Sequence, residues 1–345
     1  MATLEQLLAI ARNTFFESIR QPVLLVVLVV CTILVVLSNP FSAYTLMDDN
    51  KMFVDIGLST IFMGGAILSA FIASNVITRE IHNKTVLTVV SKPVSRSVFV
   101  LGKYLGVAGA QILAMVFLGL VFMLVEIHGV QQTVTTPYHL PVIFFGSGAI
   151  ILGAATGIWC NYFYGWVFSS TFAVCTTPLL LIAYVLALLF NHEFSTQSPA
   201  VAFDGNLWIA LLMVLLAELV LTAIAVAAST RFGQIITLLI TVGLFLLGLL
   251  SDWIFARRIN ALRDVFDSLG QSSTSPFDGA HLEFWFFKAL YAVVPNFQVF
   301  WLADAITQGS TITADYIAWT VPYGLVLIVI ALCIAIMLFQ RREVG

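Results

Sequence analysis

Charged residues are scarce in this chain. Its 345 residues include 15 Lys and Arg and 18 Asp and Glu, so charged residues make up 10% and hydrophobic residues 60%. A soluble domain carries about 25% charged residues, and this chain has too few to cover a water-facing surface. The net charge of −3 is too small to indicate a charged partner. This composition excludes an ordinary cytosolic enzyme, a secreted disulfide scaffold and a nucleic-acid-binding protein.

Motifs for catalysis and metal binding are also lacking. The five histidines are scattered over different loops without HExxH spacing, and no GxSxG sequence occurs. A GxxxxGK[ST] loop is missing as well, because Gly102-Lys103 lacks the upstream glycine and is followed by Tyr104. We therefore expect no catalytic residue, no metal site and no cofactor bound by this chain. The cysteines form no CxxC pair and are expected to be small packing residues: Cys31, Cys160, Cys175 and Cys333.

Long charge-free stretches are the main feature that the chain does have. About 20 apolar residues span a membrane as a helix, so each such stretch predicts one span and the longest, 127–192, predicts two. The polar break at 160–165 is expected to divide these two. The sequence thus predicts an all-α polytopic membrane protein with about eight transmembrane helices. The predicted spans are 22–38, 56–77, 104–126, 141–160, 164–190, 207–229, 233–251 and 317–339.

The distribution of charge predicts the orientation of these spans. With the N-terminus inside, ten of the 15 Lys and Arg residues fall on the inner side, which is the side that basic residues prefer. Four acidic residues lie inside, thirteen lie outside, and Glu218 lies within a span. We therefore expect a multi-pass protein of the cell (inner) membrane with both termini in the cytoplasm.

The chain outside the spans divides into recognisable segments. Apolar residues at three- and four-residue spacing over 3–20 predict an amphipathic helix on the inner surface, here called the elbow helix. In the outer loop 252–316, an apolar stripe predicts an amphipathic helix on the outer surface; it consists of Phe255, Ile259, Leu262, Phe266 and Leu269. The stretch 284–306 predicts either a ninth span or, as we favour, a broken re-entrant helix in the outer leaflet. The expected divisions are 1–21 for the elbow, 22–251 for spans one to seven, 252–316 for the outer helices, and 317–345 for the last span and cytoplasmic tail.

Three features are candidates for function, each with a plainer alternative. The inner loop 78–103 holds five of the ten inner basic residues, which suits either a loop that contacts lipid headgroups or a docking element for a partner. Glu218 is either a residue of a pore or gate or a neutral carboxyl group that is hydrogen-bonded to a neighbouring helix. The small residues at 64–66 and 102–110 predict close helix packing or, alternatively, dimerisation.

Several of these segments together resemble a known family. The inner loop reads Arg79-Glu80-Ile81-His82-Asn83-Lys84-Thr85, then Ser91-Lys92-Pro93-Val94-Ser95-Arg96 and Leu101-Gly102-Lys103. It is similar to the coupling segment of ATP-binding-cassette exporter permeases of the type-two class. Its nearest likeness is the branch named for multi-copper enzyme maturation, which includes the nitrous-oxide-reductase assembly permease. Segments 228–232, 294–297 and 339–343 resemble later parts of the same family, so the likeness extends over nearly the whole chain.

The resemblance implies a membrane-spanning half-channel that forms a homodimer, or a heterodimer with a similar permease, and is driven by a separate ATPase subunit. ATP and Mg would then bind to the partner ATPase and not to this chain. Segment 79–96 would contain the coupling helix, and the break at Pro295 and Asn296 would cap the exit. The residues expected to couple to the ATPase are Arg79, Glu80, His82, Asn83, Lys84 and Thr85.

Two other functions are kept as alternatives to a permease. A membrane scaffold or assembly protein without a transport cycle could use the same inner loop as a docking element. A secondary transporter is disfavoured because Glu218 is the only ionisable residue deep within a span. Typical members of the family have six spans, so the pair over 141–190 is expected to be an addition to a six-span core. The sequence does not indicate the substrate.

Overall fold

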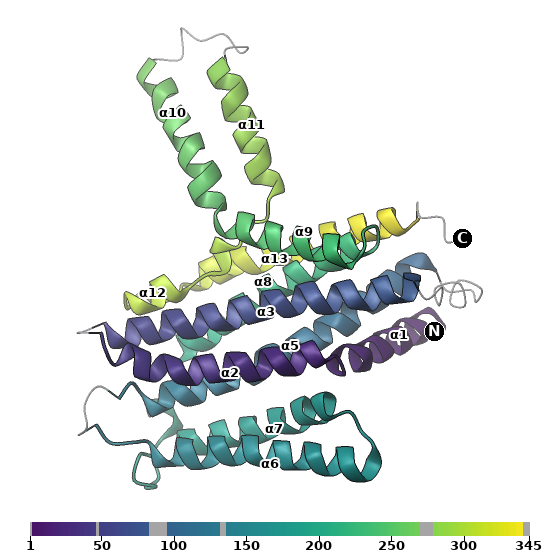
Figure 1. Ribbon diagram of the computed structural model, residues 1–345. Helices are drawn as coiled ribbons and strands as arrows, with labels where there is room; N and C mark the ends of the chain where they lie inside the picture. Colours follow the sequence, from purple (N-terminus) through teal and green to yellow (C-terminus); the bar gives the residue numbers. More distant parts are fainter. Residues whose placement is uncertain (1, 46–47, 83–94, 132–135, 270–278, 341–345) are drawn as a thin grey trace.

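The computed structural model describes residues 2–45, 48–82, 95–131, 136–269 and 279–340. Within these ranges the regular structure is helical, apart from one isolated β-bridge between Phe190 and Thr196. The helices are α1 (Ala2–Ile19), α2 (Pro22–Ser42), α3 (Asp49–His82), α5 (Arg96–His128), α6 (Leu140–Tyr164), α7 (Phe168–Leu189), η1 (Pro199–Val201), α8 (Gly205–Ser229), α9 (Gln234–Leu249), η2 (Asp252–Ala256), α10 (Arg257–Leu269), α11 (Gly279–Val293), η3 (Gln298–Phe300), α12 (Ala303–Thr307) and α13 (Ala314–Gln340) (Figure 1).

Membrane-length helices dominate this architecture. In the described ranges, seven helices are long and apolar enough to cross a membrane, namely α2, α3, α5, α6, α7, α8 and α13. Two bent pairs raise the number to nine if each is one span: α9 with the helix that follows it, bent by 53°, and α11 with the segment 298–307, bent by 51°. The prediction of an all-α polytopic membrane protein is confirmed. The predicted number of about eight spans lies between the seven and nine that the described helices allow. The predicted span at 233–251 is the short helix α9, of 16 residues.

The long helices run side by side and form an elongated bundle (Figure 1). The pair α6–α7 lies along one side of the bundle, and the pair α10–α11 projects from the opposite side at a steep angle. Helix α1 begins and helix α13 ends at the same end of the bundle, which we call the terminal end. The turn between α6 and α7 also lies at this end. That the terminal end lies in the cytoplasm remains a prediction from the charge distribution.

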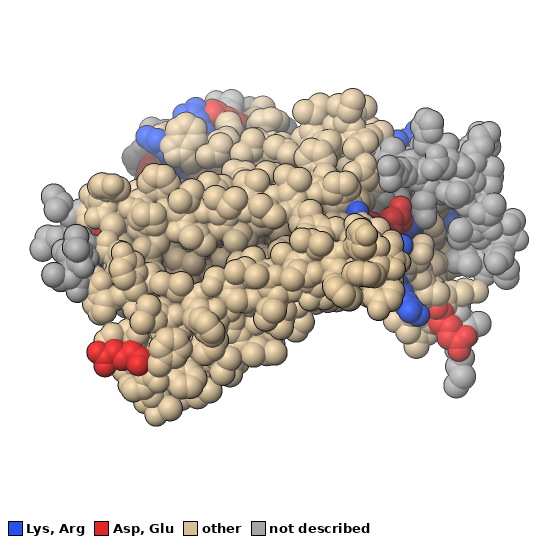
Figure 2. All heavy atoms as spheres, turned by 60° about the horizontal axis from the view of Figure 1, so that its bottom comes forward, with Lys and Arg blue, Asp and Glu red and all other residues tan. Residues whose placement is uncertain are grey.

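Charged residues avoid the length of the bundle. Figure 2 views the molecule with the α6–α7 side brought forward. Along the visible part of the bundle, Lys, Arg, Asp and Glu gather towards the two ends, and the long stretch between them is almost entirely uncharged. A surface of this kind suits a hydrocarbon environment, in which an exposed charged side chain is costly.

Helix α5 is the centre of the bundle. It contacts α1, α2, α3, α6, α7, α8 and α13, and 78% of its most apolar window is buried. Small residues allow α1 to lie close to it. A Cβ atom added at Gly102 would lie 2.7 Å from Cγ2 of Ile10, and one added at Gly106 would lie 2.6 Å from the backbone oxygen of Ala11. These glycines therefore serve packing within one chain, which supports the packing alternative for them.

The apolar stretch 141–190 divides into two helices at the predicted polar break. Gly165 ends α6 in the left-handed conformation, with φ of 67°, where glycine has no steric penalty. The side chain of Asn161 donates a hydrogen bond of 2.6 Å to the backbone oxygen of Trp166 and so closes the turn. Helices α6 and α7 then pack against each other along their length.

The amphipathic helix expected on the outer surface is covered by another helix instead. The apolar stripe of α10 packs against α11, with the ring centroids of Phe266 and Phe284 5.7 Å apart. Arg258 and Glu283 form an ion pair of 2.7 Å between the two helices. The aromatic residues 284–287 of α11 therefore divide between two environments, because Phe284 packs on Phe266 of α10 while Trp285 is 59% exposed. Sequence periodicity identifies the apolar face of α10 but not the helix that covers it.

Candidate functional site

The predicted coupling residues lie at the end of α3 and directly after it. The structure carries α3 to His82, but the side chains of Arg79, Glu80 and His82 are outside the described residues. Asn83, Lys84 and Thr85 lie entirely outside them. The helices on either side of the segment are described, α3 as far as His82 and α5 from Arg96.

The helix that leaves the coupling segment is tied to the end of α13. Ser95 caps α5 by accepting a backbone hydrogen bond. The Arg96 guanidinium donates a hydrogen bond of 2.6 Å to the backbone oxygen of Gln340, one of the carbonyl groups that a helix C-terminus leaves without a partner. The rings of Phe99 and Phe339 stack next to it, with centroids 5.4 Å apart. The start of α5 and the end of α13 are thus joined by charge and by apolar packing.

The same region is tied to α1 and α2. The Lys103 ammonium lies 3.7 Å from a carboxylate oxygen of Glu17 on α1 and 5.8 Å from the ring centroid of Phe99. Only 2% of the Lys103 side chain is exposed, and a buried ammonium group requires such partners. The Asn75 side chain on α3 donates to the side-chain oxygen of Gln21, which precedes α2. Five helices are therefore connected beside the coupling segment.

Glu218 lies in a polar cluster between three helices. Its carboxylate oxygen Oε2 accepts hydrogen bonds from Ser69 of α3 (3.2 Å) and Gln111 of α5 (3.3 Å). Ser69 also lies 2.9 Å from the hydroxyl oxygen of Thr222, one turn further along α8. Gly65 makes room for the carboxyl group, because a Cβ atom there would lie 2.6 Å from Cδ of Glu218.

This environment is that of an interhelical contact. Glu218 is fully buried, and the other oxygen of its carboxyl group, Oε1, has no hydrogen-bond partner in the described part of the chain. A buried carboxyl group of this kind holds helices together in an apolar medium, where few other polar partners exist. The geometry therefore favours the plainer of the two alternatives for Glu218.

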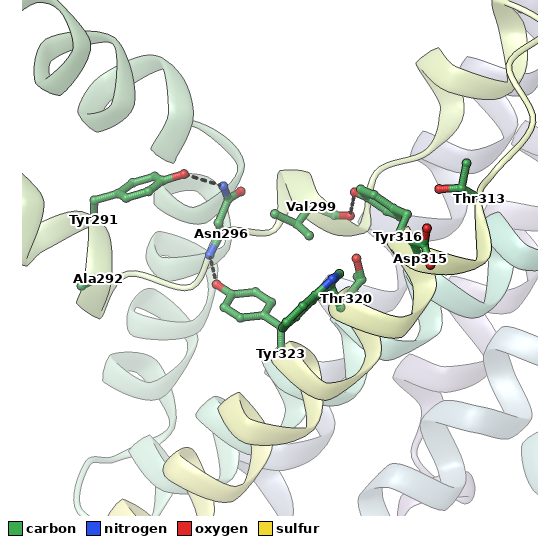
Figure 3. A pocket seen from close by; sticks show the side chains of 10 residues that line it. Tyr291, Ala292, Asn296, Val299, Thr313, Asp315, Tyr316, Thr320 and Tyr323 are labelled. Carbon is green, nitrogen blue, oxygen red and sulfur yellow. Dashed lines mark hydrogen bonds between the residues drawn. The ribbon is translucent and has the colours of Figure 1, made fainter.

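Pro295 and Asn296 lie at a sharp break between helices. Helix α11 ends at Val293, and the chain bends by 51° before 298–307. The Asn296 side chain donates to a carboxylate oxygen of Asp252 (2.8 Å) and to the hydroxyl of Tyr291 (3.2 Å). Its backbone amide donates to the hydroxyl of Tyr323 on α13 (3.0 Å) (Figure 3). One asparagine therefore joins α11, α13 and the bend that follows α9.

The two bent pairs are held to each other at this junction. The backbone amide of Phe297 donates to the backbone oxygen of Gly248 near the end of α9, at 3.1 Å. A Cβ atom at Gly248 would lie 2.5 Å from the backbone oxygen of Pro295. A larger residue at 248 would force the two bends apart. Both bends thus form one structural unit.

A cavity of about 650 Å³ opens beside this junction (Figure 3). Aromatic side chains and a few polar groups surround it, and the Tyr316 hydroxyl donates a hydrogen bond to the backbone oxygen of Val299 across it. Such a combination suits an amphiphilic molecule, with apolar walls and few polar contacts. Its lining includes Tyr291, Asn296, Asp315, Tyr316, Trp319 and Tyr323.

A second, more polar cavity of about 600 Å³ lies among the loops that follow α5 and α7. Glu126, His139, His192 and Asp204 line it. Burial lowers the pKa of His139, and the nearby His128 and His192 lower it further. In the residues that the structure describes, no three His, Cys, Asp or Glu side chains come together as a metal-binding group.

Sequence reasoning identified Glu218 and Asn296 but not their partners. Gln111 was a usable signal for the Glu218 cluster, because it is the only Ser, Thr, Asn or Gln residue of the predicted span 104–126. Ser69 and Thr222 could not be told apart from the many other Ser and Thr residues within the spans. Asp252 and Tyr291 carry no comparable signal, because they lie where polar and apolar residues alternate freely.

One family of known proteins matches part of the chain. Residues 19–177, a little under half of the sequence, match the family described as ABC-2 family transporter protein. The match includes α2, α3, α5, α6, part of α7 and the whole predicted coupling segment. It supports a permease of the ABC-2 type and, with the membrane-length helices, a multi-pass membrane protein. It also runs through α6, the helix expected to be additional to the family pattern. No protein with a curated description matches the chain.

Proposed function

We propose that this chain is the membrane-spanning permease subunit of an ATP-binding-cassette exporter, driven by a separate ATPase that binds ATP and Mg. The observation that carries the proposal is the match over 19–177, which encloses the segment 79–96. That segment joins α3 and α5, helices of 34 and 33 residues. In this proposal the chain is a transport subunit and has no catalytic residues of its own.

The contacts around the segment support a coupling role. A displacement of the segment would act directly on α5, which contacts seven other helices of the bundle. The Arg96 contact with the end of α13 and the Lys103–Glu17 pair would carry the same displacement to α13 and α1. Closure of the ATPase subunits would thereby switch the bundle between two packed states, since packed helices rearrange by shifting as bodies.

The proposal also covers the second permease chain, the exit of the path and the location of the complex. A second permease chain, identical or similar, completes the translocation path, and the junction at Asn296 caps its exit. Both termini and the coupling segment lie in the cytoplasm, and the chain resides in the cell membrane. The likeness to the multi-copper enzyme maturation branch is retained as part of this proposal, on the residues 79–103.

Charge reversal at the coupling segment tests the proposal. The double substitution Arg79→Glu and Glu80→Arg should weaken copurification with the ATPase and lower vanadate-sensitive ATPase activity, because the charged contacts with the partner become repulsive. Arg231→Glu, in the turn between α8 and α9, is the matched control for a changed charge at the same end. Membrane insertion should be unchanged in both.

A membrane scaffold without a transport cycle is the competing function. It predicts that an ATPase, if one copurifies at all, shows no vanadate-sensitive activity that depends on this chain. Unaltered copurification and activity in the double variant would contradict the coupling role of 79 and 80.

A further inference from the structure

A third cavity, of about 430 Å³, lies at the terminal end between the corner of α1 and α2 and the turn of α6 and α7. Its size falls within the range of small-molecule sites, about 300–1,000 Å³. Four kinds of group meet in it: one cationic side chain, one indole, hydroxyl groups and an apolar floor. Its lining includes Phe16, Arg20, Trp166, Ser170, Val174 and Cys175.

The walls of this cavity are fixed to each other. The Ser169 hydroxyl lies 3.3 Å from each of the backbone oxygens of Ile19 and Arg20, so the start of α7 is fastened to the corner after α1. The Asn161 side chain holds the backbone of Trp166 through its bond of 2.6 Å. The cavity is therefore part of the folded structure and does not depend on a chance arrangement of surface side chains.

The polar part of the cavity suits an anion. Arg20 is exposed and forms no ion pair with an acidic side chain in the described ranges. This distinguishes it from Lys103 and Arg96, which contact Glu17 and the end of α13. The first turn of α7 adds backbone amides that no side chain caps, and such amides favour negative charge. An arginine beside them matches the geometry of a phosphate group.

The apolar part places the site at the level of lipid headgroups. Trp166 is 56% exposed, and its ring centroid lies 5.9 Å from that of the exposed Tyr164. Two more exposed aromatic residues, Trp159 and Tyr162, lie in the last two turns of α6. Tryptophan and tyrosine concentrate at the boundary between hydrocarbon and headgroups. Val174 lies two turns into α7 and is exposed on the uncharged flank of the bundle, where acyl chains would contact it. The cavity thus leads from a cationic mouth to an acyl-facing floor.

We propose that this cavity binds an anionic phospholipid, with Arg20 pairing with the phosphate, Trp166 at headgroup level and an acyl chain against Val174 and Cys175. Basic pockets between membrane helices on the cytoplasmic side are suited to such headgroups. The bound lipid would bridge α1, α2 and the α6–α7 pair. It would join the peripheral helix pair to the elbow that packs on α5.

Native mass spectrometry of the full chain in mild detergent tests this site. Phosphatidylglycerol is titrated against phosphatidylcholine, and Arg20→Ala is compared with Arg231→Ala, which removes an exposed arginine elsewhere at the same end. We expect the wild type and Arg231→Ala to bind the first phosphatidylglycerol about fivefold more tightly than phosphatidylcholine. Both lipids carry the phosphate, but the choline cation cancels its charge in phosphatidylcholine, and the attraction of one arginine to a net negative headgroup is worth about 1 kcal/mol. Arg20→Ala should lose this preference, and Arg20→Lys should keep part of it.

A second variant separates the lipid from a free anion. Val174→Trp fills the acyl-facing floor without altering charge, and it should weaken phosphatidylglycerol binding while leaving the melting temperature in phosphatidylcholine unchanged. Free glycerol phosphate should compete only weakly. The proposal is overturned if Arg20→Ala retains the preference, if phosphatidylcholine binds the wild type equally well, or if glycerol phosphate displaces the lipid at equal concentration.

Discussion

Replacement of Gly106 by alanine tests the contact that joins α1 to α5. A Cβ atom at this position would lie 2.6 Å from the backbone oxygen of Ala11 and even closer to Cβ of Thr14. An ordinary van der Waals contact begins at 3.4 Å. The two helix backbones must therefore part by about 0.8 Å at this point, the difference between 3.4 and 2.6 Å. A backbone oxygen cannot rotate away as a flexible side chain can.

The cost of this separation can be bounded. Inserting a methyl group into a closely packed contact costs about 1–3 kcal/mol, and the backbone contact favours the upper half of that range. Helix propensity works in the opposite direction, because alanine is better than glycine in a helix by up to about 1 kcal/mol. The expected net loss is therefore about 1–2 kcal/mol. It includes weaker packing of Phe15 near Gly109, the next glycine on the same face.

Thermal unfolding of the purified chain in one detergent, at one scan rate, is the assay. Gly243→Ala is the matched control: it is also a substitution of glycine in a membrane helix, but a Cβ atom there meets nothing within 4 Å. We expect Gly106→Ala to unfold a few degrees below the wild type, on a scale of about 2–4 °C per kcal/mol for domains of 150–250 residues. Gly243→Ala should be unchanged or slightly more stable. Equal stability of the two variants would refute the described packing of α1 on α5.

Two further substitutions test the polar clusters. Glu218→Gln keeps an oxygen that accepts from the two donors, so stability and transport should stay close to wild type. Glu218→Leu leaves those donors unsatisfied and should cost about 1–3 kcal/mol of stability. A loss of turnover in Glu218→Gln with an unchanged melting curve would instead give the carboxyl group a functional role. Asn296→Ala removes the contacts to Asp252 and Tyr291 and should speed limited proteolysis of the α10–α11 pair several-fold relative to Asn260→Ala, an exposed control on α10. Equal cleavage rates in the two alanine variants would show that the junction does not restrain the pair.

The positions of the helices could be predicted because charge is excluded from hydrocarbon. The gaps in the charge pattern locate the membrane helices, and the Asn161–Gly165 break locates the turn between α6 and α7. The ends of the helices were predicted less well. Helix α5 begins at Arg96 and not near 104. It continues beyond the apolar stretch because its two basic residues there have partners: Lys103 pairs with Glu17, and Arg96 donates to the backbone oxygen of Gln340 at the end of α13.

Which helices lie next to each other could not be predicted in the same way. In lipid, an apolar side chain gains little by choosing a protein neighbour over a lipid neighbour, so the sequence of α5 does not reveal that Gly106 faces Thr14. The partners of Glu218 come from residues 69 and 111, far apart in the chain. The pairing of α10 with α11 is likewise a tertiary contact, and the stripe on α10 taken alone suited a membrane surface equally well.

Photocrosslinking from the coupling segment is the measurement that tests the central claim most directly. A photoreactive amino acid at Thr85, and for comparison at Asn161 in the α6–α7 turn of the same end, is activated in membranes that contain the candidate ATPase. The proposed function predicts a crosslink to the ATPase from position 85 that changes in yield when ATP and vanadate are added, and little or none from position 161. Equal yields from both positions, or no crosslink from 85, would contradict the assignment of this chain as an ATPase-driven permease coupled through residues 79–96.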